Sequence, residues 1–220
     1  MLYELPAKHH YLTLDALFSF SLTGSSEKLY SYTDDEGLVP GINDTESFVR
    51  IIFLINSCQS NVSELSSIKA NYIFYLDAEP VERPVVPHHF QLVFSPTIEE
   101  PIFTAWAAAV MRYLCACFFA PSIPAFDNHD ISSVLLGTKS SLLSFNLVRG
   151  ECVEQMRRPL SNIPQSNHLL AVLFTPPYWS ASNEYFSLLN ESIPSLDGGL
   201  VKGGCAFHPY KEQVLMILGD

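Results

Sequence analysis

Charged residues are scarce in this sequence, and basic residues are the scarcest. Only 16% of the 220 residues are charged, and 12 Lys and Arg stand against 23 Asp and Glu, which gives a formal net charge of −11. A surface of that sign repels phosphate backbones and anionic lipid headgroups. We therefore expect neither nucleic acid nor a membrane surface as a partner.

Repeats and low-complexity tracts are also absent. The 10 Gly and 15 Pro are scattered without a period, and apolar residues make up 48% of the chain. This composition excludes a collagen-like or disordered protein. A globular chain of this length buries a core without disulfides or metal.

Cysteine is present in an odd number, five, and the N-terminus lacks a charged leader followed by an apolar segment. Both features predict a reducing, cytoplasmic location. Cys115 and Cys117 form a C-x-C pair, but no second pair completes a tetrahedral metal site. We interpret them as buried small hydrophobic residues.

Common catalytic and phosphate-binding motifs are missing. The sequence contains no GxxxxGK[ST], GxGxxG or GxSxG, the loops that hold phosphates or a nucleophilic serine. The pairs His9, His10 and His88, His89 lack the i, i+4 spacing that places two imidazoles on one helical face. We interpret them as solvated loop residues and predict no cofactor and no metal.

The first half contains three apolar runs that predict strands, at residues 48–56, 71–77 and 90–95. Continuous apolar strands are typical of a parallel sheet covered on both faces. Residues 11–22 are ambiguous between helix and strand, and the polar residues 31–43 predict a loop.

A long helix is predicted from about Thr97 to Ala120. Thr97 and Glu100 have capping-box spacing, and Pro121 stops the helix. Residues 102–120 are nearly long enough to cross a bilayer, so a membrane-spanning segment is an open alternative. Against it, Arg112 near the middle would cost about 2.5–3.5 kcal/mol, and a buried helix is the preferred interpretation.

The second half predicts a separate α+β unit. Strands are expected at residues 142–148, 169–174, 199–207 and 213–218, and helices at residues 151–158 and 182–190. This order favours a mixed sheet with helices on one face. The last two strands are expected to form a hairpin.

The most polar spot of the second half is Asp127, Asn128, His129 and Asp130. Two carboxylates three residues apart orient a water or a cation when they share the first turn of a helix. The competing interpretation is an ordinary N-terminal cap for a helix that starts near Ile131.

Several segments, taken in order, resemble the FtsZ/tubulin family. FDNHDISSVL at residues 126–135, after a long helix, resembles that family's synergy loop, with Asp127, Asp130, Ile131 and Val134 on its D-x-x-D-V-x-x-V pattern. RGECVEQMRRPL at residues 149–160 resembles the G-E-x-R-A…PLL helix that follows. The closing segment is similar too, with His208 where the family usually has Asp.

The phosphate-binding part of the family pattern is missing. Residues 57–63 read SCQSNVS, without glycine, where the family has a glycine-rich loop, and Gly24 stands alone where the first glycine loop is expected. The resemblance therefore implies a shortened, degenerate relative that binds no GTP, because glycine lets backbone N–H groups approach phosphate closely.

The resemblance implies three parts: a reduced α/β nucleotide-binding-like domain at residues 1–96, a central helix at residues 97–122, and an activation-like α+β domain at residues 123–220. It also implies a non-catalytic protein that caps or modulates a cytoskeletal or division filament. The interface residues would be Phe126, Asp127, Asn128, His129 and Asp130. The alternative function is a hydrolase that uses Asp127, His129 and Asp130.

Overall fold

The computed structural model divides into two compact units, which are described separately. The first is Met1–Phe119 with Ser141–Leu143, and the second is Ala120–Ser140 with Ser144–Asp220. The structure describes residues 9–13, 17–21, 28–33, 37–40, 50–55, 71–96, 101–119, 122–123, 128–138, 140–152, 154–156, 167–175, 184, 187, 200–207 and 213–220.

The first unit is built around parallel strands, as the apolar runs predicted. They are β5 (Arg50–Ile55), β6 (Tyr72–Asp77) and β7 (His89–Val93). β6 pairs in parallel with both of the others. β7 also pairs in parallel with the first residues of β9 (Leu142–Gly150). Every residue of β6 is buried, so this strand lies inside the sheet with both of its faces covered.

An antiparallel ribbon extends this sheet on the β5 side. It consists of β1 (His9–Thr13), β2 (Leu17–Ser21), β3 (Lys28–Thr33) and β4 (Gly37–Pro40), and β1 pairs with β5. The loop predicted over residues 31–43 is therefore wrong for Ser31 to Thr33 and for Gly37 to Pro40. Paired strands form here because the hydrogen bonds between strands join backbone N–H and C=O groups, which polar and apolar segments have alike.

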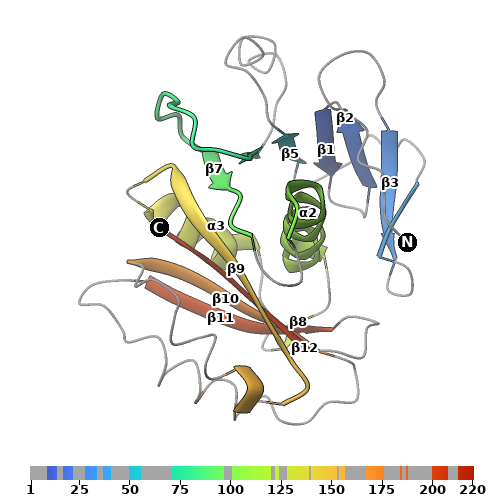
Figure 1. Ribbon diagram of the computed structural model, residues 1–220, viewed down its shortest axis with the longest axis vertical. Helices are drawn as coiled ribbons and strands as arrows, with labels where there is room; N and C mark the ends of the chain where they lie inside the picture. The colour runs from blue at the N-terminus through green and yellow to red at the C-terminus, as the bar shows by residue number, and fades with distance from the viewer. Residues whose placement is uncertain are drawn as a thin grey trace. The chain divides into compact units, whose positions relative to one another are not determined.

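The helix α2 (Phe103–Phe119) follows the sheet (Figure 1). It begins later than predicted: Pro101 is not helical, and the Ile102 carbonyl accepts the first helical bond, from the Trp106 N–H at 3.1 Å. Its end, before Pro121, is confirmed. No helix among the described segments combines the length and apolarity needed to span a bilayer.

Aromatic side chains join α2 to one face of the sheet. Phe53 and Phe90 each place their ring 5.6 Å from Phe74, so one ring from each parallel strand forms a row. Tyr72, two residues before Phe74 on the same face, lies 5.6 Å from Phe118 of α2. The side chains of β6 alternate, so Tyr75 and Asp77 point to the opposite face.

The second unit contains a mixed sheet, as predicted. Its order is β9, β12 (Gln213–Gly219), β10 (His168–Thr175), β11 (Leu200–Phe207) and β8 (Ser122–Ile123). The helix α3 (Asn128–Gly137) packs against β10 and β11 (Figure 1). The helix predicted at residues 151–158 is described at Glu151, Cys152 and Glu154–Met156: the first two residues form a bend, so its predicted start is wrong, and the last three are helical. The helix predicted at residues 182–190 is described at Glu184 and Ser187, which are both helical.

The expected closing hairpin is wrong. β11 and β12 do not pair with each other, because β10 lies between them, parallel to β11 and antiparallel to β12. β10 carries seven consecutive buried residues from Leu169 to Thr175, and a strand this apolar is best covered in the middle of a sheet.

A polar contact closes one end of this second sheet. The Asp220 carboxylate accepts the backbone N–H of His168 at 2.8 Å and lies 3.6 Å from its ring Nδ1. The His168 ring rests against Gly137 at the end of α3, so closely that a Cβ on Gly137 would lie 2.6 Å from the ring. The three residues join α3, β10 and β12.

The cysteine prediction is confirmed and the histidine prediction is partly wrong. Cys115 and Cys117 are buried, and burial raises the pKa of both thiols well above the ordinary value. His9 and His10 belong to β1, and His89 is the half-buried first residue of β7, so these are not loop residues. His88 is an exposed turn residue with φ of 66°.

Candidate functional site

The carboxyl edge of the parallel strands is the first place to look for a site, because open α/β sheets bind ligands there. Residues 57–63, where glycine is missing after β5, lie outside the described residues. The described part of this edge is the end of β6 and the segment of residues 78–88 that leads to β7.

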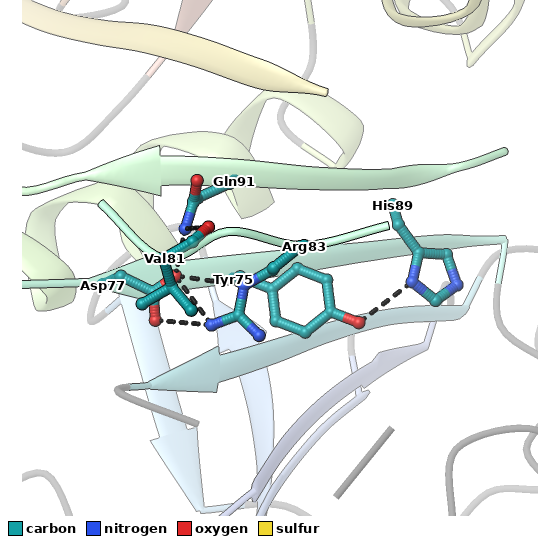
Figure 2. A network of polar contacts seen from close by, with 6 residues as sticks. All are labelled: Tyr75, Asp77, Val81, Arg83, His89 and Gln91. Atoms are coloured by element: carbon teal, nitrogen blue, oxygen red, sulfur yellow. Dashed lines mark hydrogen bonds and ion pairs between the residues drawn. The ribbon is translucent and has the colours of Figure 1, made fainter. Parts of the chain in front are cut away.

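Asp77, the last residue of β6, is the centre of a polar network (Figure 2). Arg83 donates from Nη2 to Oδ1 at 2.9 Å and to Oδ2 at 2.8 Å, and from Nε to Oδ2 at 3.3 Å. Gln91 of β7 donates from Nε2 to Oδ2 at 2.7 Å. Both carboxylate oxygens are therefore engaged by side chains of the same unit.

The ion pair between Asp77 and Arg83 is almost completely buried, so the stability of each charge depends on the other. The side chains of Arg83 and Asp77 are only 7% and 1% exposed. The guanidinium also lies over the Tyr75 ring, 4.0 Å from its centroid, a cation–π contact. A buried charge without its partner is costly, so removing either member destabilises far more than breaking a surface ion pair.

Tyr75 extends the network toward the start of β7. Its hydroxyl lies 3.0 Å from Nδ1 of His89, with the direction of the hydrogen bond set by the imidazole tautomer. Burial raises the pKa of Tyr75, partly offset by the nearby Arg83. Burial, together with the neighbouring His88, lowers the pKa of His89. Both shifts favour the neutral form of the side chain.

Chemically, this network is suited to holding a loop. The Asp77 carboxylate accepts hydrogen bonds from both Arg83 and Gln91, and Gln91 additionally donates to the Val81 carbonyl at 3.0 Å. Three side chains of the sheet thus hold residues 78–88 on the face opposite α2: Asp77 and Tyr75 contact Arg83, and Gln91 contacts Val81. Among the residues with assigned positions, no three His, Cys, Asp or Glu side chains are grouped as metal ligands.

Sequence reasoning missed this network. The signals available were a carboxylate directly after the apolar run YIFYL and an arginine six residues later in a proline-rich segment. An acidic residue at the end of a buried strand needs a partner. The sequence does not say that Arg83, rather than a ligand, is that partner.

The predicted interface segment lies at the beginning of α3. Asn128, His129 and Asp130 form the first helical turn, so the helix starts at Asn128 and not near Ile131. Phe126 and Asp127 lie outside the described residues. The hydrolase alternative needs Asp127 beside His129 and Asp130. Because Asp127 lies outside the described residues, this alternative stays untested.

The first turn of α3 has one exposed and one anchored side. His129 is exposed and Asp130 half-buried, while the Ser133 hydroxyl donates to the Asp130 carbonyl at 2.8 Å. The apolar residues that hold the helix on the sheet are each 1% exposed: Ile131, Val134 and Leu135. Leu136, 53% exposed, lies seven positions after His129 and so on the same outward stripe.

Comparison with known proteins identifies the fold. No family model matches the sequence, and no curated protein matches it. Two solved structures of FtsZ from M. jannaschii do match in fold. One is an empty dimer, with a TM-score of 0.54 and 10% identity, covering 78% of this chain and 63% of that chain. The other has a TM-score of 0.52 and 12% identity, covering 79% and 66%.

A third similar structure is the GDP-form protofilament of TubZ from Bacillus thuringiensis serovar israelensis. It has a TM-score of 0.52 and 11% identity, covering 79% of this chain and 61% of that chain. This chain thus spans less than two thirds of the length of each of these structures. The fold is FtsZ/tubulin-like, as the ordered sequence segments predicted.

Proposed function

We propose that this chain is a non-catalytic FtsZ/tubulin-like protein that binds a filament of FtsZ/tubulin-like subunits and caps or modulates it. The observation that carries the proposal is the Asp77–Arg83 ion pair at the carboxyl end of β6. A nucleotide site in an open α/β sheet needs that edge for its ligand. Here a strand-end carboxylate and a basic side chain neutralise each other instead.

The absence of glycine supports the same conclusion. Phosphate groups bind to backbone N–H groups that approach them closely, which glycine permits and the side chains of residues 57–63 hinder. The net charge of −11 also disfavours an anionic substrate. We therefore infer a degenerate nucleotide domain that neither binds nor hydrolyses GTP, in a protein located in the cytoplasm.

The filament contact is assigned to the start of α3 and the residues just before it. His129 is exposed there and Leu136 continues the same stripe. TubZ, whose fold this chain shares, was crystallised as protofilaments. A chain that keeps one contact face and lacks a functional nucleotide site would join such a filament at one end only, which is how a cap acts.

Co-sedimentation tests the contact. Assembled M. jannaschii FtsZ and B. thuringiensis TubZ are each pelleted with the chain, and the length and mass of the filaments are followed. Asp127→Ala with Asp130→Ala should reduce the effect at least fivefold. The matched control, Glu151→Ala with Glu154→Ala, removes the same charge from two exposed positions of the same unit and should leave it unchanged.

Nucleotide binding is tested separately with labelled GTP and Mg²⁺. We expect no saturable binding, and a micromolar Kd, about −8 kcal/mol, would contradict the degenerate nucleotide domain. If filaments of both types are unaffected by the wild-type chain, the filament proposal is wrong. Loss of a hydrolytic activity in the Asp127 and Asp130 variant would instead support the hydrolase alternative.

A further inference from the structure

The segment between β6 and β7, residues 78–88, is held in place at three points. The Arg83 side chain is bound to Asp77, the Val81 carbonyl accepts from Gln91 at 3.0 Å, and the Val86 carbonyl accepts from the His89 N–H at 3.1 Å. Figure 2 shows Arg83 inserted between Asp77 and the Tyr75 ring. A connection without helix or strand is thereby given a defined position.

Proline gives the same segment a defined backbone. The rings of Pro80, Pro84 and Pro87 restrict φ to about −65°, and a following proline restricts the residue before it to extended or polyproline II conformations. Among the described non-glycine residues, only His88 has a positive φ. Proline thus restricts the backbone at Arg83, Pro84, Val86 and Pro87 in the sequence R-P-V-V-P, which favours a polyproline II conformation there.

The outward side of this segment is apolar and has an acidic margin. Pro84 and Pro87 are exposed, and Val85 is 80% exposed, more than any other exposed large apolar residue in the described part of the chain. Glu79 and Glu82, just before them, are also exposed. Arg83 is directed inward, so the ridge presents apolar groups together with negative charge.

We propose that residues 84–87 are a docking ligand for a partner protein that has an aromatic-lined, polyproline-binding groove with a basic rim. Such grooves recognise P-x-x-P segments, which lose little entropy on binding because they are already extended. The basic rim follows from Glu79 and Glu82. A second copy of this chain is a poor occupant, since both copies carry a net charge of −11. This surface is independent of the filament contact.

The test uses purified SH3, WW and EVH1 domains as probes, immobilised singly, with the full chain in solution. We expect binding to domains whose groove has basic residues at its rim. Val85→Asp, and separately Pro84→Ala with Pro87→Ala, should weaken binding at least tenfold. The control Ile102→Asp changes another exposed apolar side chain of the first unit, just before α2, and should not alter the Kd.

Preordering is tested with a free peptide of residues 79–88, which should bind about tenfold more weakly than the folded chain because it must be ordered on binding. If the peptide and the folded chain bind with equal affinity, the claim that the fold orders this segment before binding is wrong. Absence of binding to every domain, or binding that the Val85 and proline variants do not weaken, would overturn the docking site. If the wild-type chain forms a dimer and Val85→Asp makes it monomeric, the surface serves self-association instead, and the proposal is wrong. Thermal unfolding confirms that each variant is folded.

Discussion

Replacing Arg83 with Met should destabilise the first unit strongly. Met keeps much of the apolar stem but removes the guanidinium, which leaves the Asp77 carboxylate, 1% exposed, with Gln91 at 2.7 Å as the donor that remains from the network. Removing one partner of a buried ion pair costs about 3–5 kcal/mol. An exposed pair would cost about 0–1 kcal/mol, so the two cases are easily separated.

Thermal and urea unfolding measure the effect. For a chain of this size, about 1 kcal/mol lowers Tm by roughly 2–4 °C, so a loss of about 3–5 kcal/mol corresponds to a fall of roughly 6–20 °C. The chain has two compact units, so the transition should be followed by probes in each. Trp106 fluorescence reports the first unit, with the second tryptophan, Trp179, replaced by Phe.

A double variant separates the ion pair from its surroundings. Arg83→Met combined with Asp77→Leu should recover most of the loss, because apolar replacement of both partners is often neutral or stabilising. Glu82→Ala, an exposed neighbour in the same segment, serves as control and should stay within about 0.5 kcal/mol of the wild type. If Arg83→Met alone costs less than about 1 kcal/mol, the network does not hold the loop as we have argued.

Three further predictions concern other contacts. Trp106→Ala should cost about 3–5 kcal/mol in urea unfolding, because a 3% exposed aromatic side chain is removed from the core; an unchanged midpoint would refute its core position. Gly137→Ala should cost about 1–3 kcal/mol, since the new Cβ would lie 2.6 Å from the His168 ring. In a chain that already carries His168→Ala, the same substitution should cost less, because the clashing ring is gone. An equal cost in the two backgrounds would contradict the clash. The lowered pKa of His89 predicts that stability falls as pH drops below about 6.5, where the unfolded chain takes up a proton that the folded chain resists; His89→Gln should reduce this dependence between pH 7.5 and 5.5, and an unaltered slope would exclude His89 as its cause.

The sequence alone located the elements that are mostly apolar. β5, β6, β7, α2, β10 and β12 all coincide with predominantly apolar runs, because burial on several sides favours apolar residues at most positions and so marks the segment regardless of its neighbours. The order of these elements also carried the family resemblance, and the FtsZ/tubulin-like fold is confirmed by comparison with solved structures.

Strand pairing was decided by the tertiary structure. β11 and β12 are adjacent in the sequence, yet β10 separates them in the sheet. Likewise β1–β4 form a ribbon from residues whose sequence is ambiguous or polar. Which strand lies beside which depends on competition among distant segments for hydrogen-bonding partners, and no local pattern encodes its outcome.

The candidate site divides in the same way. The sequence singled out Phe126 to Asp130, and the structure describes Asn128, His129 and Asp130 as the first turn of α3; their docking role stays a prediction. The Asp77–Arg83 pair emerged only from the structure. A carboxylate and a guanidinium six residues apart are commonplace in a sequence. Only the fold of the loop between β6 and β7 determines that they are buried together, and for that reason we expect the loss of either partner to destabilise the protein strongly.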